Sequence, residues 1–467
     1  MGGRLIEEMK ILLVSLGCDK NLVDSEVMLG ILADKGYTFT DDETEAEIAV
    51  VNTCCFINDA KEESINAILE MAELKKSGQI KALIVTGCLA QRYQDEIRKE
   101  IEEVDAIIGT GAIDKIAEAV EEAVDGNGTA GKDGEAPARG KGRKYLAPLN
   151  GKTAGNRKRI VTTGGYFAYL KIAEGCDKNC TYCVIPKVRG PYRSIPMEEL
   201  VAEAETLAKE GVKELILVAQ ETTLYGKDLY GEKKLPALLE KLCGIEGLCW
   251  LRILYCYPEE ITDELIQVMK KESKICHYLD MPVQHGSDRI LKRMGRRTDS
   301  CEIRGIVKKL RENIPDICLR TTLITGFPGE TEEDFEELLD FVDEMEFERL
   351  GVFTYSMEED TPAASMPHQL DEDIKEERRN AVMELQQEIA YEAAEKMIGK
   401  MLTVMIEGKV AGEDVYVART YKDAPNVDGY LFINTDRQLM SGEFVQVRVT
   451  GSHEYDLIGE MCDELTK

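Results

Sequence analysis

Residues 176–183 read CDKNCTYC, and they come just after the apolar run FAYLKI at residues 167–172. The run has the character of a β-strand, and Gly175 opens the loop that follows it. The three thiolates at Cys176, Cys180 and Cys183 are spaced to wrap one face of a cuboidal iron–sulfur cluster. A tetrahedral zinc site would need a fourth Cys or His nearby, and none follows soon. Three cysteines leave one iron of a 4Fe–4S cluster open to a substrate.

Similar apolar runs recur through the centre of the chain. They lie at residues 214–219, 251–256, 278–283, 317–325 and 350–355. Each except the last is followed by a helical pattern, and the last leads through a loop into a helix predicted at 373–398. Six βα units predict a partial (β/α)6 barrel over residues 160–397, with its active site at the carboxyl ends of the strands.

The N-terminal residues 1–125 show the same alternation. Strands are predicted at 10–16, 47–52, 82–86 and 106–109, and helices at 24–35, 60–76 and 91–103. This order indicates an α/β domain with a doubly wound parallel sheet. The strands are continuously apolar, as expected for a sheet covered on both faces.

A second set of cysteines ends three of these strands: Cys18, Cys54 and Cys88. The carboxyl ends of parallel strands lie on one edge of a sheet, so the three thiols should converge there. We interpret them as ligands of an auxiliary 4Fe–4S cluster, again with an open iron. The alternative is that they are buried structural cysteines. Cys55 adjoins Cys54 and should point the other way by alternation.

Two further segments complete the chain. Residues 126–159 have no period and predict a Gly-rich linker, and between 136 and 160 there are eight Lys or Arg and no acid. This basic stretch is either a solvated linker or a contact for nucleic acid or an acidic surface. Residues 398–467 predict a small five-stranded β-barrel of the oligonucleotide-binding kind, with strands at 403–407, 414–418, 430–433, 444–449 and 455–459.

Composition narrows the function classes. The chain has 467 residues, 43% of them hydrophobic, and a formal net charge of −30. Such an acidic chain is a poor candidate for non-specific nucleic-acid binding, which needs Lys and Arg. Fourteen cysteines are too few for a secreted disulfide scaffold of this length. The sequence has neither a signal-peptide pattern nor a membrane-spanning run, so we expect a cytoplasmic protein with reduced thiols.

These modules, in this order, resemble the radical-SAM methylthiotransferases. The CxxxCxxC motif after a barrel strand, the segments LGCDKNLVDSE, NTC and GCLAQR, and a C-terminal TRAM-like barrel carry the resemblance over nearly the whole chain. Within the family, MPVQHGSD at 281–288, with His285, and YSMEEDTPAA at 355–364 resemble the branch that modifies an aspartate of small-subunit ribosomal protein S-twelve. The sequence departs from the family pattern at Arg193 and in its long linker.

The resemblance implies a reaction and its cofactors. Two S-adenosylmethionine molecules would be used per turnover, one as methyl donor and one as the source of a 5′-deoxyadenosyl radical that attacks the aspartate β-carbon. Two 4Fe–4S clusters would serve, the auxiliary one delivering the sulfur, and a reductant such as flavodoxin or ferredoxin would supply electrons. The S-adenosylmethionine contacts implied in the same way are Tyr182, Gln220, Glu221, Gln284, Ser287, Arg320 and Thr322. Some of these polar residues have a structural alternative, the satisfaction of loop backbone groups.

The substrate is the remaining question. Residues 400–467 carry seven Lys or Arg against twelve Asp or Glu. A barrel that grips tRNA should have a basic face, whereas an acidic barrel complements a basic ribosomal protein. We therefore favour the protein substrate. The alternatives are methylthiolation of a tRNA adenosine and a non-catalytic, zinc-stabilised module that binds ribosomes or RNA.

Overall fold

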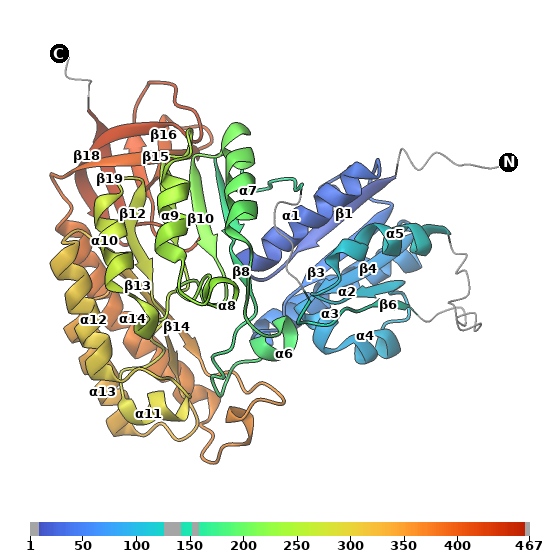
Figure 1. Cartoon of the computed structure of the whole chain (residues 1–467), viewed down its shortest axis with the longest axis horizontal. Coiled ribbons are helices and arrows are strands. Elements are labelled where there is room, and N and C mark those ends of the chain that lie inside the picture. The colour runs from blue at the N-terminus through green and yellow to red at the C-terminus, as the bar shows by residue number, and fades with distance from the viewer. Residues whose placement is uncertain (1–8, 126–141, 152–157, 463–467) are drawn as a thin grey trace.

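The computed structural model describes residues 9–125, 142–151 and 158–462. The chain forms an N-terminal α/β domain, a central open barrel and a C-terminal closed barrel, as predicted (Figure 1). The N-terminal domain and the closed barrel both lie against the central domain. Within the described ranges, no helix combines the length and the apolar character that crossing a membrane requires.

The N-terminal domain is built on a six-stranded parallel sheet in the order β2-β1-β3-β4-β5-β6. Its strands are β1 (Lys10–Ser15), β2 (Thr38–Phe39), β3 (Ile48–Thr53), β4 (Ala82–Gly87), β5 (Ala106–Ile108) and β6 (Arg143–Tyr145). Helices α1 (Asp19–Asp34) and α5 (Ile116–Asp125) share one hydrophobic core with the sheet, and α2 (Asn58–Lys76), α3 (Cys88–Arg92) and α4 (Gln94–Glu100) share another. Two cores on two faces confirm the doubly wound arrangement.

Three details differ from the sequence prediction. The predicted linker contains β6, which pairs with β5 at the edge of the sheet; three polar residues are too few to show a strand period. Helix α1 begins at residue 19 rather than 24, because its first turns are polar and nevertheless buried. The single helix predicted at 91–103 is two helices, α3 and α4. The rest of the predicted linker, 126–141 and 152–157, lies outside the described residues.

The central domain is a six-stranded parallel sheet in simple order, β14-β13-β12-β11-β10-β7. The strands are β7 (Phe167–Lys171), β10 (Glu214–Val218), β11 (Trp250–Ile253), β12 (Ile275–Asp280), β13 (Cys318–Thr325) and β14 (Arg349–Thr354). The long helices are α7 (Met197–Lys209), α9 (Leu235–Cys243), α10 (Asp263–Lys271), α12 (Ser300–Asn313), α13 (Glu332–Met345) and α14 (Glu372–Glu395). Side chains of all six contribute to one hydrophobic core with the sheet, as expected for a partial (β/α)6 barrel.

Short elements lie in the loops of this domain. They are the hairpin strands β8 (Ala173–Glu174) and β9 (Arg193–Ser194), and the helices α6 (Ile185–Arg189), α8 (Lys227–Tyr230) and α11 (Asp288–Arg293). Short 3-10 turns, one of them in the N-terminal domain, occur at Ile113–Lys115, Pro258–Glu260 and Ala363–Ser365.

The C-terminal domain is a closed barrel in the order β15-β16-β17-β19-β18. Its strands are β15 (Met401–Lys409), β16 (Val415–Thr420), β17 (Leu431–Asn434), β18 (Phe444–His453) and β19 (Asp456–Met461). The barrel docks on the amino-terminal side of the central strands, where Trp250 packs edge-on against Phe444 with ring centroids 4.8 Å apart. This docking leaves the carboxyl ends of the central strands facing the N-terminal domain.

Candidate active site between two cysteine triads

The first triad, Cys18, Cys54 and Cys88, lies at the carboxyl ends of the adjacent strands β1, β3 and β4. Cys18 is the N-cap of α1, and Cys88 is the first residue of α3. Helix N-termini carry partial positive charge, which favours thiolates at both positions. The predicted convergence of these three cysteines on one sheet edge is therefore what the fold produces.

Two thiols of the first triad, Cys54 and Cys88, are buried, and Cys18 is half-buried. Burial, reinforced by the neighbouring Cys88, raises the pKa of the Cys54 thiol to about 12. Burial also raises the pKa of Cys88, while the Arg189 guanidinium opposes this shift. Cys55 has no exposed surface and lies in the same apolar core as Cys88, and burial, together with Cys88 and Cys54, raises its pKa; that it is not a ligand stays a prediction.

The second triad, Cys176, Cys180 and Cys183, lies in the loop after the short strand β8. The backbone N–H of Lys178 donates to Cys176 Sγ at 3.4 Å, and the Tyr257 hydroxyl lies 3.9 Å from Cys180 Sγ. Burial is the largest cause of a raised pKa at Cys176, to about 12, and at Cys183. Cys180 adds to both shifts, which reflects how close the thiols are.

All fourteen cysteines, which lie within the described ranges, are free thiols. Among the described residues, no group of three or more His, Cys, Asp or Glu side chains is spaced to hold a single metal ion. A cuboidal cluster is bulkier than one ion and needs its thiolates farther apart. Each triad consists of thiols alone, and this is the donor set of an iron–sulfur cluster.

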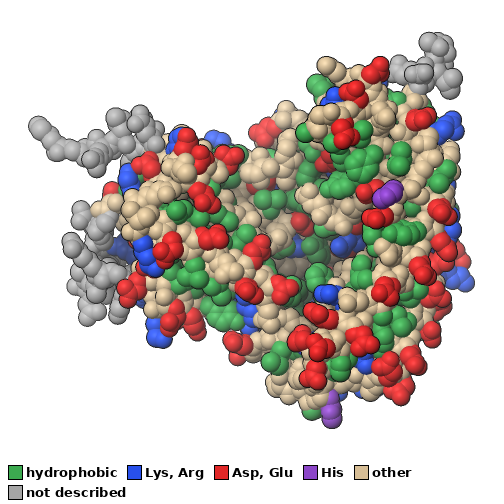
Figure 2. Space-filling view, turned by 180° about the vertical axis from the view of Figure 1, so that it is seen from behind, with side chains coloured by type: hydrophobic (Ala, Val, Ile, Leu, Met, Phe, Trp, Pro, Cys, Tyr) green, Lys and Arg blue, Asp and Glu red, His purple; other side chains and the backbone are tan. Residues whose placement is uncertain are grey.

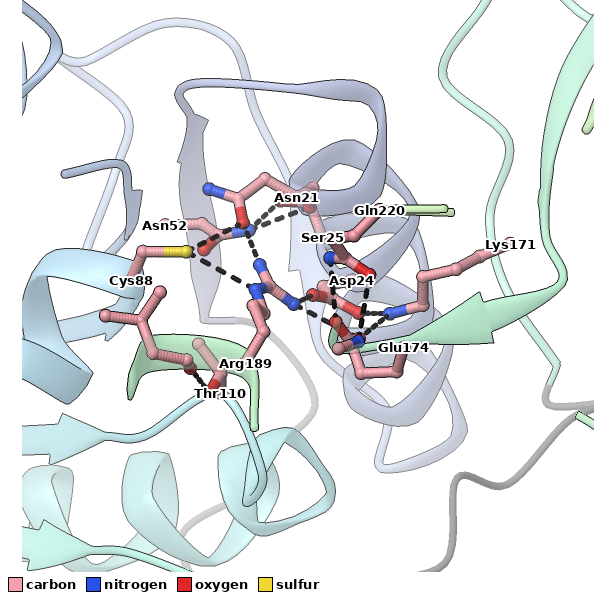
Figure 3. A network of polar contacts seen from close by, with 12 residues as sticks. Asn21, Asp24, Ser25, Asn52, Cys88, Thr110, Lys171, Glu174, Arg189 and Gln220 are labelled. Carbon is pink, nitrogen blue, oxygen red and sulfur yellow. Dashed lines mark hydrogen bonds and ion pairs between the residues drawn. The ribbon is translucent and has the colours of Figure 1, made fainter. Parts of the chain in front are cut away.

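A buried polar network leads from Cys88 of the first triad through Arg189 and Glu174 to Gln220 (Figure 3). Arg189, which is 2% exposed, donates from Nε to Cys88 Sγ at 3.3 Å. Its Nη1 donates to the carboxylates of Asp24, at 2.6 Å, and Glu174, at 3.3 Å, and its Nη2 donates to Asn21 Oδ1. Lys171 binds the same two carboxylates. A single arginine thus connects a cysteine of the N-terminal domain with the strand that leads to CDKNCTYC.

The network continues to the second triad through Gln220. Gln220 Nε2 donates to Glu174 at 3.0 Å, and its Oε1 accepts a hydrogen bond from the Gly175 backbone N–H at 2.9 Å. Gly175 has φ of +80°, and a Cβ there would come within 2.1 Å of the Pro191 carbonyl oxygen, so only glycine fits. The loop that presents Cys176 is therefore held at its first residue.

Helix α1 carries side chains of the N-terminal domain to the central strands. Lys20 of α1 is buried, and its ammonium lies 3.3 Å from the ring centroid of Tyr255, which follows β11. Tyr255 has a φ of +61°, a strained conformation for a non-glycine residue and one that is common at functional sites. In Figure 2 a hollow with Lys and Arg side chains lies between the N-terminal domain and the rest of the molecule.

The predicted contacts Gln220 and Glu221 both follow β10. Glu221 is fully buried, and its Oε1 accepts from the Thr223 backbone, while Oε2 has no hydrogen-bond partner among the described residues. Burial raises the pKa of Glu221 to about 7, although Lys178, 3.9 Å away, opposes the shift. A buried carboxylate oxygen beside the cysteine loop that accepts no hydrogen bond can still accept one from a ligand ammonium.

The predicted contacts after β12 and on β13 lie near one another. Gln284 adopts φ of +78°, and its backbone bonds to Thr322 and Ile324. Arg320 and Thr322 alternate with buried residues on β13, so both point to the less buried face of this strand. Arg320 donates to Asp280 at 3.0 Å and also pairs with Asp428 of the closed barrel. Its guanidinium is thus already engaged on two sides.

Ser287 and His285 have structural partners. The Ser287 hydroxyl donates to Asp334 at 2.9 Å, and Asp334 belongs to the capping box of α13. His285 is fully buried, accepts from the Ser287 N–H, and lies 3.4 Å from Glu330. Tyr182, between two cysteines of the loop, packs edge-on against Phe327 at 6.4 Å. The structure therefore brings the Gly326–Gly329 turn to Tyr182.

Several residues of the site were not found from the sequence. Lys178 sits inside the cysteine motif and binds Glu259 at 3.0 Å, and Arg296 lies over the Tyr257 ring at 4.3 Å. Arg189 follows the motif by six positions. The signal that could have found Arg189 is its place just after the cysteines, but nothing local in the sequence reveals that Cys88 is its partner.

A loop of the central domain closes against the N-terminal domain. Glu358, after β14, accepts hydrogen bonds from Lys61 at 3.0 Å and Arg92 at 2.8 Å. Arg92 also bonds to the backbone of Glu359. This second bridge, made by Arg92 at the other end of the helix α3 that begins at Cys88, fixes the N-terminal domain to the loop after β14.

Comparison with known families agrees with this architecture. Residues 10–109 match the model described as uncharacterized protein family UPF0004, residues 170–342 match the Radical SAM superfamily, and residues 398–462 match the TRAM domain. The Radical SAM match implies a 4Fe–4S cluster and S-adenosylmethionine. The structure resembles the radical S-adenosylmethionine methyltransferase TsrM from Kitasatospora setae, with a TM-score of 0.56 and 16% identity over 86% of this chain and 79% of that one, a likeness of fold.

Curated relatives match almost from end to end. The chain is 62% identical over 97% of its length to the ribosomal protein uS12 methylthiotransferase RimO of Lachnoclostridium phytofermentans, 99% of which is covered. It is 49% identical over 98% of its length to the RimO of Clostridioides difficile, all of which is covered (100%). Two cysteine triads, a radical-SAM barrel and a TRAM barrel, together with this identity, place the chain in the RimO family of ribosomal protein uS12 methylthiotransferases.

Proposed function

We propose that this protein transfers a methylthio group to the β-carbon of an aspartate of ribosomal protein uS12. The observation that carries the proposal is a pair of thiol triads, one in each domain, with a polar network that runs from Cys88 through Arg189 and Glu174 to the Gly175 backbone that opens the second cysteine loop. A methylthiotransferase needs a radical-generating site and a sulfur-delivering site within reach of one substrate carbon. The reaction belongs in the cytoplasm, where ribosomes are assembled.

Cys176, Cys180 and Cys183 are the proposed ligands of the radical-SAM 4Fe–4S cluster, and Cys18, Cys54 and Cys88 those of an auxiliary 4Fe–4S cluster. Each set offers three thiols at the carboxyl ends of parallel strands or in the loop beyond them. When bound, the clusters supply reductive cleavage of S-adenosylmethionine and a site for sulfur. A low-potential carrier such as flavodoxin or ferredoxin is the proposed electron donor.

The chain's own residues bind and orient the cosubstrate. Glu221 Oε2 is the proposed acceptor for the methionine ammonium, because it is buried and accepts no hydrogen bond among the described residues, its nearest cation being Lys178 at 3.9 Å. Gln220 orients the cysteine loop through Gly175. Thr322, Gln284 and Arg320 would face the ribose or the carboxylate.

Tyr182 and Ser287 complete the proposed set of cosubstrate residues. Tyr182 would pack near the adenine, since it is held beside the cysteines by Phe327. Ser287 is proposed to act through Asp334, which receives its hydroxyl and anchors α13. Arg189, Asp24 and Glu174 are buried, and we expect their burial to keep water away from Cys88.

The test is turnover by the anaerobically reconstituted full chain with methyl-labelled S-adenosylmethionine, supplied with ribosomes, a uS12 loop peptide and tRNA. Mass spectrometry is expected to find the label on the uS12 aspartate. Cys180→Ala and Cys54→Ala should each remove one cluster, about four irons, and abolish the product. Label on tRNA adenosine, and none on uS12, would establish the alternative substrate instead.

A further inference from the structure

Arg189 is a buried cation with one nitrogen committed to a sulfur atom. Its Nε–H donates to Cys88 Sγ at 3.3 Å, while its terminal nitrogens bind Asp24, Glu174 and Asn21. The carboxylates hold the guanidinium in one orientation, since both are themselves buried. A bidentate or multiply bonded guanidinium of this kind is a fixed group rather than a mobile side chain.

The element that carries Arg189 also connects the two triads. Helix α6 begins two residues after Cys183 and ends at Arg189. A helix of five residues is about 7.5 Å long. Thr110 of the N-terminal domain bonds to the carbonyl of Val188, so the end of α6 is pinned beside Cys88. The distance and orientation of Arg189 relative to the first triad are therefore set by the fold.

The charges around Arg189 are nearly balanced but asymmetrically placed. Two cations, Arg189 and Lys171, face two carboxylates, Asp24 and Glu174. Only the cation of Arg189 lies against the sulfur; Lys171 binds the carboxylates behind it. Hydrogen bonds to cluster sulfurs, and positive charge beside them, stabilise the reduced and more negative state of an iron–sulfur cluster.

We infer that Arg189 is a positioning residue that raises the reduction potential of the auxiliary cluster through its N–H···S bond to Cys88. The inference rests on the ligand set of the proposed function. It concerns a one-electron couple: the cluster gains one electron from an external one-electron reductant, and no covalent bond forms or breaks. Substitution of Arg189 removes the donor and leaves Asp24 and Glu174 with one cation fewer.

The experiment isolates the auxiliary cluster in the full chain. Cys176, Cys180 and Cys183 are replaced by Ala, the chain is reconstituted with iron and sulfide, and the potential is measured by EPR-monitored titration with dithionite. In this parent, Arg189→Met is expected to shift the potential to a lower value. Arg189→Lys keeps the positive charge but loses the planar guanidinium and its Nε–H donor, so a smaller downward shift of the potential is expected.

Lys171→Met is the matched control, because it removes a cation from the same network without removing the N–H···S donor. Its shift should be smaller than that of Arg189→Met. Equal potentials in the parent and Arg189→Met, or equal shifts in Lys171→Met and Arg189→Met, would overturn the inference. The inference would also be overturned if both Arg189 variants lost their iron while Lys171→Met kept its iron, because Arg189 would then be needed to hold the cluster site together and not to tune its potential. A parent that binds no iron would instead contradict the ligand set of the proposed function.

Discussion

At the scale of single residues, the geometry of the first triad depends on Gly17. It has φ of +92°, and a Cβ at this position would lie 2.7 Å from Cys54 Cβ and 3.0 Å from Cys54 Sγ. We predict that Gly17→Ala both strains the backbone and displaces the Cys54 thiol. The expected loss is roughly 1–3 kcal/mol of stability, with reduced iron content after reconstitution, measured by urea unfolding and iron analysis.

Gly36→Ala separates these two effects. Gly36 has the same φ of +92°, but no heavy atom of the described residues lies within 4 Å of its would-be Cβ beyond its chain neighbours. This variant should lose stability from backbone strain alone, about 1 kcal/mol, and keep its full iron. If the two variants lost equal stability and equal iron, the contact with Cys54 would have no role.

Because the pKa of Glu221 is raised in the folded chain, we predict that the free energy of unfolding depends on pH. Burial raises its pKa from 4.5 to about 7, so between these pH values the folded chain binds a proton that the unfolded chain has released. The contribution of Glu221 to stability therefore falls as pH rises from about 4.5 to about 7 and is constant above. Glu221→Gln, with no proton to lose, should gain stability relative to wild type over that window.

The measurement is urea unfolding of the metal-free full chain, wild type and Glu221→Gln, at several pH values across the window. The stability difference between the two is expected to widen in favour of the variant with rising pH and then to level off. A difference that stays flat from about pH 4.5 to pH 8 would mean that Glu221 ionises freely in the fold.

Some residues of the candidate site could be predicted from the sequence and others could not. The cysteines were predictable, because a CxxxCxxC spacing and three strand-end positions are local patterns that the fold converts into proximity. Arg189 and Lys20 were not, since each is defined by a partner in another domain, Cys88 and Tyr255 respectively. For Ser287 the contact with the cosubstrate stays a prediction; its hydroxyl donates to Asp334, a partner 47 positions away that the sequence alone does not reveal.

At the scale of elements, the parallel strands were predicted closely and α1 was not. All six central strands overlap predicted apolar runs, although β12 begins at Ile275, three residues before the predicted 278, and ends at Asp280. Buried parallel strands are apolar throughout, which is why the runs mark them, whereas β14 is only partly buried. Helix α1 starts five residues earlier than its apolar period indicates, since its first turns bury Lys20, Asn21 and Asp24 against the central domain. A helix that is polar and buried is recognisable only when both domains are in place.

The loop after β14 is the element that latches the N-terminal domain. The Glu358 side chain is 2% exposed and bonds to Lys61 and Arg92. We predict that Glu358→Gln weakens this latch by about 1–3 kcal/mol, because it removes the charge that two partly buried cations share. Hydrogen–deuterium exchange should speed up in the loop and at the start of α2.

Glu359→Gln is the control for the latch. This neighbouring carboxylate is exposed and reaches only the Tyr93 hydroxyl, at 3.4 Å, among the described residues. Exchange in Glu359→Gln should equal that of wild type. The latch would be refuted if Glu358→Gln also left exchange in the loop and in α2 unchanged.

At the scale of the whole molecule, the acidic excess of the C-terminal barrel is partly internal. Asp423 pairs with Arg349, and Asp428 pairs with Arg320 and accepts from the Tyr278 hydroxyl at 2.7 Å. These carboxylates hold the closed barrel to the central one, so they are not available to a basic substrate. The composition of the segment could not reveal this, because net charge does not distinguish docking contacts from free surface.

The deepest of these docking contacts is a fully buried cluster of charges. Arg419 of the closed barrel and Arg252 of β11 both bind Glu214 of β10, at 2.6 and 2.7 Å, and none of the three is exposed. Removing one partner leaves a buried charge less compensated, which typically costs 3–5 kcal/mol. We therefore predict that Arg419→Met lowers the temperature at which the closed barrel unfolds and separates its transition from that of the central domain in calorimetry.

Two further variants test whether a change in the Arg419→Met transition comes from the buried charge cluster. Arg437→Met removes an exposed arginine whose partner Glu443 lies 2.8 Å away, and such a surface pair contributes at most about 1 kcal/mol, so its transition should be unchanged. The double variant Glu214→Gln with Arg419→Met should lose further stability, because Arg252, whose carboxylate partner in this cluster is Glu214, is then a buried cation without one. If Arg419→Met unfolded like Arg437→Met, the cluster would not be what docks the closed barrel, and the apolar contact of Trp250 with Phe444 would have to hold it instead.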